Sequence, residues 1–323
     1  MFIGLTYDLK SEYLKKGFLP DEVAEFDSEE TIEGIESALH KLGHKTERIG
    51  NILQLADALV NDKRWELVFN ICEGYYGMGR EAQVPALLDA YKIPYTFSDP
   101  LTLSLTLHKG LTKRVIRDAG IPTAQFFLVE NDKEAEICKL PFPVFIKPVA
   151  EGSGKGVSAK SIVHSQESFK LEVTRLIKEY HQPVLVEKLL TGREFTVGIL
   201  GTGKEARVVG VMEVIIRHDA EDSTYSRFIK ENYINRVEYQ LIKNEIYAIC
   251  AEISLKVWRV LGCRDAGRID LKMDENRTLN FIEVNPLPGI NHFHSDLPIM
   301  LYKQGWNYIQ LIDEIICSAI QRF

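Results

Sequence analysis

Four polar residues in the last quarter of the sequence have the types and spacing of a metal-assisted catalytic site. A polar turn, DENR, separates the segments RIDLKM and FIEVN, which predicts a β-hairpin. In a symmetric hairpin Asp270 lies opposite Glu283. Arg268 then lies opposite Asn285, on the same face, because side chains alternate along a strand. The intervening residues are expected on the other, apolar face: Ile269, Leu271, Ile282 and Val284.

The two facing carboxylates, Asp270 and Glu283, repel each other, so we expect a cation between them. Their oxygens, with the amide oxygen of Asn285, are hard ligands that suit Mg²⁺ bound also to nucleotide phosphates. The alternative is a surface hairpin in which Arg268 neutralises both acids. A shift of one residue in the register would separate the four side chains and remove the site.

A glycine-rich loop, EGSGKG, follows an apolar strand that ends near Lys147. Glycines let the backbone N–H groups of Gly152, Ser153 and their neighbours approach phosphate oxygens closely. A lysine at the end of an apolar strand needs an anionic partner, and phosphate is a suitable one. The alternative for the loop, which begins at Glu151, is an ordinary flexible hairpin.

A third segment, PVLVEKLLTGREFTV, offers an apolar strand with charged residues at its end. The strand ends at Glu187 and Lys188, and Glu194 opens the next strand. A nucleotide base fits an apolar slot between strands, and a ribose binds to a carboxylate that accepts its hydroxyl hydrogen bonds. The segment is therefore consistent with one end of a nucleotide site.

Composition places these motifs in a globular enzyme. The 323 residues suit two or three domains, and the 45% of hydrophobic residues is ordinary. The net charge of −7 disfavours a nucleic-acid partner, whose protein surfaces are usually basic. No apolar run reaches the ~20 residues of a membrane span, and no basic segment precedes the first apolar stretch. Five scattered cysteines and these features predict a cytoplasmic protein.

Strands and helices alternate in the first part of the sequence, and strands predominate in the last part. Residues 1–98 alternate apolar strands with amphipathic helices, which predicts an open, mainly parallel sheet. Its ligands should lie at the carboxyl ends of the strands, near Tyr7 and in the segment 70–76. From about residue 190 the chain contains more strands than helices.

Taken together, these motifs resemble the ATP-grasp superfamily and, within it, the D-alanine–D-alanine ligase family. The likeness extends from about Phe69 onward and includes HKGLTK, IKPVAEGSGKG, VEKLLTGREFTVGILG, LGCRDAGRIDLKM and FIEVNPLPG. It implies an α/β ATP-grasp fold of three domains. These would be an N-terminal Rossmann-like substrate domain (1–98) with an open parallel sheet and two α+β lobes (99–189 and 190–323) that clasp ATP.

The resemblance also implies the reaction and the residues that perform it. In this family a carboxylate takes the γ-phosphate of ATP, and an amine then displaces phosphate from the acyl phosphate to form an amide. The implied ATP contacts are Lys109, Lys147, Glu151, Gly152, Ser153, Glu187, Lys188, Leu190, Glu194 and Lys230. The implied ligands of two Mg²⁺ ions, which Mn²⁺ could replace, are Asp270, Glu283 and Asn285. The implied catalytic groups are the guanidinium of Arg268, the backbone N–H of Gly289 and Ser153 in the loop.

The substrate half of the sequence departs from the family pattern. Glu73 stands where the family usually has histidine, and it would either meet substrate or pair with Arg80 or a lysine. The first-strand loop is replaced, so either Glu25 or Asp27 would hold the substrate amine. Ser295 would meet the second carboxylate. The lysine–tyrosine pair of the flexible loop is also altered, so the tyrosine would be Tyr225 or Tyr233.

Three functions are therefore compatible with the sequence. The first is a dipeptide-forming ligase that uses ATP and amino-acid-like substrates. The second is a ligase of the same chemistry for another amino acid or metabolite. The third is a nucleotide-binding module without catalysis, which the complete polar set on the hairpin disfavours. Relatives in this family suggest a homodimer, and we expect no nucleic-acid or membrane partner.

Overall fold

Three separate β-sheets organise the chain in the computed structural model, which describes residues 1–216 and 237–323. The first sheet is parallel, in the order β2-β1-β3, as the alternating N-terminal pattern predicts. Its strands are β1 (Phe2–Thr6), β2 (Lys45–Gly50) and β3 (Leu67–Asn70). The helices of this region are α1 (Lys10–Lys15), α2 (Glu29–Lys41), α3 (Ile52–Val60), the 3-10 turn η1 (Arg80–Ala82) and α4 (Gln83–Tyr91).

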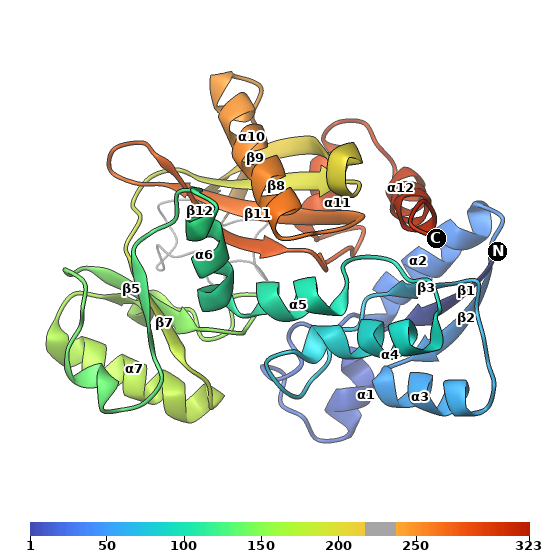
Figure 1. Ribbon diagram of the computed structural model, residues 1–323, viewed down its shortest axis with the longest axis horizontal. Helices are drawn as coiled ribbons and strands as arrows, with labels where there is room; N and C mark the ends of the chain where they lie inside the picture. The colour runs from blue at the N-terminus through green and yellow to red at the C-terminus, as the bar shows by residue number, and fades with distance from the viewer. Residues whose placement is uncertain (217–236) are drawn as a thin grey trace.

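The second sheet is antiparallel, in the order β4-β7-β5-β6. Figure 1 shows helix α7 lying along it. Its strands are β4 (Phe126–Val129), β5 (Val144–Pro148), β6 (Ile162–Val163) and β7 (Val184–Lys188). The helical segments are α5 (Pro100–Leu107), α6 (Lys109–Asp118), η2 (Glu134–Glu136), η3 (Ala159–Ser161) and α7 (Gln166–Tyr180).

The third sheet, also antiparallel, has the order β10-β9-β8-β11-β12. Its strands are β8 (Glu194–Leu200), β9 (Arg207–Ile216), β10 (Val237–Leu241), β11 (Ala266–Met273) and β12 (Leu279–Asn285). The helical segments are η4 (Gly203–Glu205), α10 (Glu245–Val260), α11 (Asp296–Tyr302) and α12 (Tyr308–Ile320). In the described part of the chain, no helix is long and apolar enough to cross a membrane.

The hairpin β11–β12 has the predicted register at its functional end. Arg268 pairs with Asn285, and Asp270 pairs with Glu283. A β-bulge then shifts the register, so that Leu271 faces Phe281. The bulge turns Ile282 to the cavity described below, and its prediction as a core residue is wrong. The other three residues of the apolar face are buried: Ile269, Leu271 and Val284.

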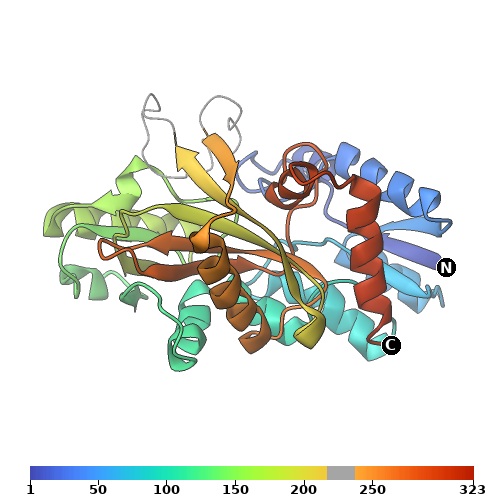
Figure 2. The ribbon, with the colours of Figure 1, turned by 90° about the horizontal axis from the view of Figure 1, so that it is seen from above.

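One hydrophobic core joins the two ends of the chain. Helix α12 packs against α2, and both contribute apolar side chains to the cluster beneath the parallel sheet. The cluster includes Ile35 and Leu39 from α2 and Ile312 and Ile315 from α12. Figure 2 shows α12 beside the N-terminal helices, on the side of the molecule away from α7. The predicted domain limits at residues 98 and 189 stay predictions.

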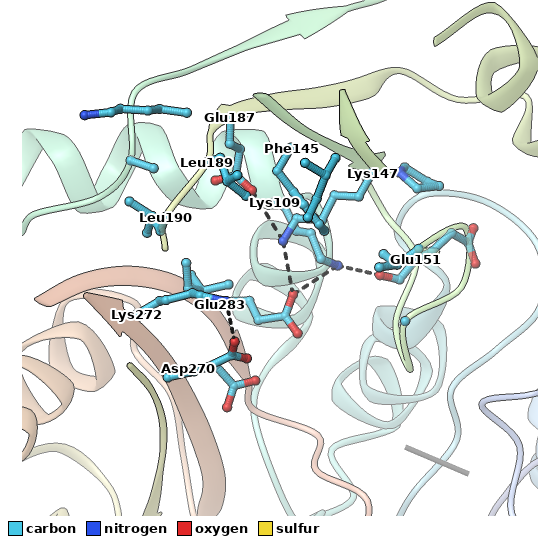
Figure 3. A pocket seen from close by; sticks show the side chains of 18 of the residues that line it. Lys109, Phe145, Lys147, Glu151, Glu187, Leu189, Leu190, Asp270, Lys272 and Glu283 are labelled. Carbon is cyan, nitrogen blue, oxygen red and sulfur yellow. Dashed lines mark hydrogen bonds and ion pairs between the residues drawn. The ribbon is translucent and has the colours of Figure 1, made fainter. Parts of the chain in front are cut away.

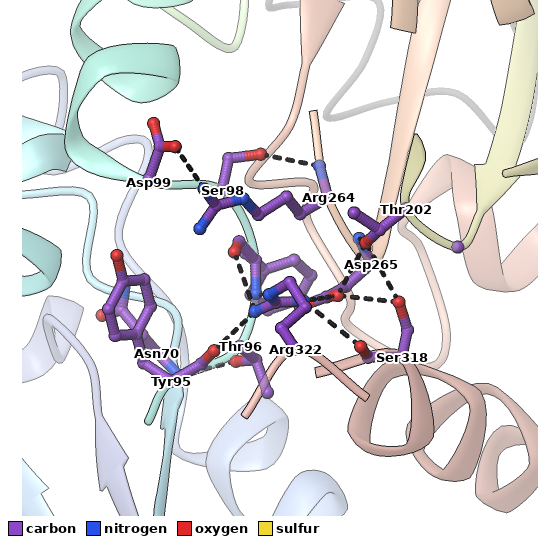
Figure 4. A network of polar contacts seen from close by, with 12 residues as sticks. Asn70, Tyr95, Thr96, Ser98, Asp99, Thr202, Arg264, Asp265, Ser318 and Arg322 are labelled. Atoms are coloured by element: carbon purple, nitrogen blue, oxygen red, sulfur yellow. Dashed lines mark hydrogen bonds and ion pairs between the residues drawn. The ribbon is translucent and has the colours of Figure 1, made fainter. Parts of the chain in front are cut away.

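A buried ion pair fastens the segment after α12 to the rest of the fold (Figure 4). Asp265 is fully buried and pairs with the guanidinium of Arg322. The backbone N–H of Phe97 and the hydroxyl of Ser318 donate to the same carboxylate, at 2.7 and 2.8 Å. Arg322 also donates to the carbonyl oxygen of Tyr95 at 2.8 Å. The network therefore connects the segment between α4 and α5, the loop between α10 and β11, and the C-terminal end of α12.

Replacing Arg322 with glutamine should destabilise the protein by about 3 kcal/mol, because it leaves the buried Asp265 carboxylate without its cation. Urea denaturation at pH 7 measures the loss. Arg114→Gln, on the exposed surface of α6, is the matched control and should change the free energy of unfolding very little. Equal effects of the two substitutions would contradict a structural role for the pair.

Candidate active site

A cavity of about 370 Å³ lies between the second and third sheets, and it collects most of the predicted nucleotide residues (Figure 3). Strands β5 and β7 form one wall, and the hairpin β11–β12 forms the other. The predicted ATP and metal residues that line it are Lys109, Lys147, Glu151, Gly152, Glu187, Lys188, Leu190, Glu194, Asp270 and Glu283. Residues from distant parts of the chain thus meet at one cleft.

Two lysines bring positive charge close to the hairpin wall of this cavity. The Nζ atoms of Lys109, at the start of α6, and Lys147, on β5, lie 3.9 and 3.7 Å from a carboxylate oxygen of Glu283. Burial works to lower the pKa of Lys147, but the Glu187 and Glu283 carboxylates outweigh it and raise that pKa. For Lys109 burial prevails and lowers the pKa. Both groups are placed to bind an anionic phosphate beside the hairpin.

Lys113 belongs to the same charged cluster, although the sequence interpretation did not include it. Its side chain is fully buried, and its Nζ lies 2.6 Å from Glu187, which also contacts Lys147 at 3.4 Å. Burial raises the pKa of Glu187, but the two lysines outweigh burial and lower it. The spacing in HKGLTK was the available signal, since Lys109 and Lys113 are four residues apart on one helix face.

The far end of the cavity has the features expected for a nucleoside. Leu190 supplies apolar surface, and Lys188 pairs with Glu275 in the hairpin turn. Glu194, at the start of β8, accepts a hydrogen bond from Lys272 at 2.8 Å. These residues lie together as predicted, while their individual roles stay predictions.

The glycine-rich loop is tied to the N-terminal region by Glu25. The backbone N–H of Gly152 donates to one carboxylate oxygen of Glu25, and the guanidinium of Arg80 donates to the other at 2.9 Å. Burial raises the pKa of Glu25, but the charges of Arg80 and Lys155, with the hydrogen bonds from Arg80 and Gly152, together outweigh burial and lower it. Within the loop, Lys155 pairs with Glu151 at 2.7 Å. Both oxygens of Glu25 are thus already engaged with protein groups.

A second cavity, of about 450 Å³, adjoins the first and contains the predicted catalytic groups. Lys109, Gly152 and Glu283 line both cavities, so the two are neighbours. The predicted catalytic and substrate residues on its wall are Ser153, Arg268, Gly289, Ser295, Glu25, Asp27 and Glu73. Gly289 and Ser295 are adjacent, since a Cβ on Gly289 would lie 3.0 Å from the Ser295 hydroxyl.

Among the described residues, Asp296, Asp270 and Asn285 hold Arg268 at the junction of the cavities. Its Nη1 lies 3.0 Å from the carboxylate of Asp296, the first residue of α11, and its Nε lies 3.5 Å from Asp270. With its amide turned so that the oxygen faces the guanidinium, Asn285 accepts from Arg268 at 3.0 Å. Asp296 is a buried site residue that the sequence interpretation missed, although it directly follows Ser295.

Glu73 lies among other acids instead of pairing with Arg80. In the part of the chain that the structure describes, Arg80 forms ion pairs with Glu25 and Glu151, not with Glu73. Burial, followed by the charges of Glu81, Glu25 and Asp27, raises the pKa of Glu73 well above its usual value. The predicted alternative of a Glu73–Arg80 ion pair is therefore wrong.

The oxygen ligands on the hairpin are of the type that magnesium prefers, but they are few. Across residues 1–216 and 237–323, no three His, Cys, Asp or Glu side chains gather as a complete protein metal site. Asp270, Glu283 and Asn285 supply two carboxylates and one amide on a single face. This fits ions that take their remaining oxygens from nucleotide phosphates and water, as Mg²⁺ usually does.

One segment with predicted site residues lies outside the described part of the chain. Lys230, predicted to contact ATP, and the two candidate tyrosines, Tyr225 and Tyr233, belong to it. Tyr239, on β10, does line the second cavity.

Comparison with known proteins identifies the family to which this arrangement belongs. The family model described as "D-ala D-ala ligase C-terminus" matches residues 115–317, more than half of the chain. The chain belongs to the D-alanine–D-alanine ligase family. The predicted membership is thereby confirmed.

Proteins with similar sequences align with most of this chain. A D-alanine–D-alanine ligase of Aquifex aeolicus is 32% identical over 292 residues, which are 88% of this chain and 93% of that protein. A ligase of the same name from Haemophilus ducreyi is 30% identical over 292 residues, 88% of this chain and 91% of that protein. The uncharacterized protein y4sG of Sinorhizobium fredii is 31% identical over 259 residues, 80% of this chain and 75% of that one.

Solved structures share the fold. The D-alanine–D-alanine ligase of Bacillus anthracis superposes with a TM-score of 0.75 at 21% identity, over 99% of this chain and 98% of that one. The VanG D-Ala:D-Ser ligase of Enterococcus faecalis gives 0.74 at 20% identity, over 98% and 99%. The predicted ATP-grasp fold is confirmed, and the chain is an ATP-dependent ligase that forms a C–N bond.

Lys113→Met should raise the KM for ATP about tenfold, because Glu187 would then attract Lys147 away from the phosphate position. Steady-state kinetics with varied ATP, together with the melting temperature, separate binding from folding. Lys178→Met, on the exposed face of α7, is the control. A lower melting temperature with an unchanged KM would mean that Lys113 only supports the fold.

Proposed function

We propose that this ligase joins two amino-acid-like substrates through an acyl phosphate, with Mg²⁺ bound at the hairpin β11–β12. The supporting observation is the placement of Arg268 between Asp270 and the second cavity. A guanidinium there lies next to the proposed metal ligands and also faces the space where a carbonyl would react. The alternative of a nucleotide-binding module without catalysis has no supporting observation.

ATP would occupy the first cavity along its whole length. Lys109 and Lys147 would bind its phosphates, with the backbone N–H groups of the glycine loop above them. The adenine would lie in the slot that Leu190 lines, and Glu194 would accept hydrogen bonds from the ribose. Lys113 would act indirectly, by holding Glu187 in place.

Asp270, Glu283 and Asn285 would hold the magnesium ions, which shield the charge of the phosphates and align the γ-phosphate with the substrate carboxylate. We propose two ions, as the family resemblance suggests. Asn285 would bind through its amide oxygen, which now faces Arg268, so its side chain would have to serve both groups.

Arg268 would stabilise the negative oxygen of the tetrahedral intermediate, helped by the backbone N–H of Gly289. Preformed donors of this kind lower the barrier because they do not need to reorganise during the reaction. Ser153, which lines the second cavity in the glycine loop, would contact the bound substrates. Ser295, adjacent to Gly289, would donate a hydrogen bond to the second substrate.

Asp27 is the stronger candidate for binding a substrate ammonium, because both oxygens of Glu25 are already engaged. Asp27 lines the cavity, and burial followed by the charge of Asp8 raises its pKa to about 7. A bound ammonium would stabilise its ionised form. We further propose a cytoplasmic homodimer without nucleic-acid partners, in keeping with the acidic composition.

A screen for ADP release over D- and L-amino acids, with product mass, tests the proposed reaction. The expected result is a dipeptide or amide product formed with stoichiometric ADP. ATP turnover that no amino acid stimulates would contradict the proposal.

Glu283→Gln should lower kcat at least about 100-fold, a loss near 2.7 kcal/mol, because it removes one of the two metal carboxylates. The measurement is the Mg²⁺ dependence of ADP release. Glu205→Gln, exposed in η4, is the control and should behave as wild type. A Glu283→Gln rate within about threefold of wild type would refute the metal role.

Arg268→Lys should lower kcat about 100-fold and leave the KM for ATP nearly unchanged. Lysine keeps the charge but lacks the planar fork that now contacts Asp270, Asn285 and Asp296. Kinetics at saturating and limiting ATP distinguish the two effects. A raised KM with unchanged kcat would assign Arg268 to nucleotide binding.

A further inference from the structure

The three residues that open the glycine-rich loop, 150–152, have four main-chain groups that are hydrogen-bonded to side chains. These side chains come from the segment before α2, the turn η1, the start of α6 and the segment between α7 and β7. They are Glu25, Arg80, Lys109 and Gln182. Most buried main-chain groups in proteins bond to other main-chain groups. The position of this loop therefore depends on side chains from distant parts of the sequence.

Arg80 links the start of the loop to the N-terminal region. Its guanidinium donates to the carbonyl oxygen of Ala150 at 2.8 Å and to a carboxylate oxygen of Glu25 at 2.9 Å. The other oxygen of Glu25 accepts from the backbone N–H of Gly152. Arg80 also lies 3.8 Å from the carboxylate of Glu151. A planar guanidinium that binds a carbonyl and a carboxylate together fixes the direction of both as well as their distance.

The side chain of Arg80 is buried and keeps its charge. Burial works to lower its pKa, but the carboxylates of Glu25 and Glu151 outweigh burial and raise that pKa. Glu151 lines the first cavity and Glu25 the second, whereas Arg80 is not among the described residues that line either one. Arg80 therefore acts on the two cavities through the residues that it holds.

The position of Lys109 depends on the same three residues. Its Nζ donates to the carbonyl oxygen of Glu151, which directly follows Ala150, and lies 3.9 Å from Glu283. If the carbonyl of Ala150 moved, the next peptide group would move with it, because the two share a Cα atom. The acceptor that directs the Lys109 ammonium toward the proposed phosphate position would then be displaced.

We propose that Arg80 is a positioning residue for the use of ATP: it holds residues 150–152 so that Lys109 meets the phosphates and the loop keeps water from the acyl phosphate. This inference rests on the proposed function, because it takes ATP to lie in the first cavity and the reaction to pass through an acyl phosphate. It adds that a residue of the N-terminal region determines how much ATP is cleaved for each amide formed.

Loss of this hold would let water reach the intermediate. The water oxygen would attack the carbonyl carbon of the acyl phosphate, and the bond between that carbon and the phosphate oxygen would break. Phosphate would leave with the electron pair, the protons of the water would pass to phosphate and solvent, and the substrate carboxylate would be restored. ADP and phosphate would then form without an amide, so the amount of ADP per amide reports on the hold.

Arg80→Gln tests the proposal, because glutamine cannot bind the Ala150 carbonyl as a cation and leaves Glu25 without its charge partner. ADP and amide are measured in the same reaction, with the pair of amino acids that gives most product in the ADP-release screen. The wild-type enzyme should release about one ADP per amide, and Arg80→Gln should release at least about two. The KM for ATP should also rise about tenfold, since Lys109 would be displaced.

Arg64→Gln is the matched control. Arg64 belongs to the same N-terminal region and donates to the carbonyl oxygens of Leu59 and Lys63 at 3.2 and 2.7 Å. It is exposed and is not among the described residues that line either cavity. The ratio of ADP to amide and the KM for ATP should both stay as in the wild type.

An Arg80→Gln enzyme with a lower melting temperature but an unchanged ratio and KM would overturn the inference. The amount of ADP per amide does not depend on how much enzyme is folded, so Arg80 would then only support the fold. A wild-type enzyme that forms no amide at all would instead contradict the proposed function, which is a separate result.

Gln182→Ala keeps the inference testable if Arg80→Gln does not fold. Gln182 is half-buried and holds the same residues from the other side, by accepting from the backbone N–H of Ala150 at 2.6 Å and donating to the Glu151 carboxylate at 2.7 Å. Its loss should also raise the amount of ADP per amide. An unchanged ratio in this variant would overturn the claim that the hold on residues 150–152 determines how ATP is used.

Discussion

The pairing of β11 with β12 is the constraint on which the rest of the site depends. Side chains alternate along a strand, so one residue of slippage would send Asp270 and Glu283 to the core and Ile269 to the cleft. Two features fix the register. The apolar residues of β11 and β12 are buried under the sheet, and β8 pairs with the other edge of β11. The packing of apolar residues on one face of the hairpin thus determines which polar side chains reach the cleft on its other face.

Opposite charges in the cleft are balanced across four elements. Lys113 on α6, Glu187 on β7 and Lys147 on β5 form a buried chain of contacts that ends at Glu283 on β12. Each group would be costly to bury alone, and each is acceptable because the next one compensates it. The chain joins the second sheet to the third, so the geometry around ATP depends on both sheets being folded.

The sequence was sufficient to predict the fold class, the hairpin register and the residues that gather at the nucleotide cavity. The alternation of apolar and polar residues along the strands, and the order and spacing of the motifs, carry that information. It was not sufficient for Lys113 or Asp296, because their importance comes from partners distant in sequence, Glu187 and Arg268. It also misplaced Ile282, since a β-bulge leaves no clear signal in an alternating apolar strand.

The joining of α2 and α12 in one core has a consequence for how the protein folds during synthesis. The parallel sheet is made early, but the helix that completes its hydrophobic cluster leaves the ribosome long afterwards. Until then the apolar face of α2 is exposed, and the anchor for Tyr95 and Phe97 that Arg322 provides is missing. The nascent chain should therefore depend on chaperones that shield apolar surface until α12 is available.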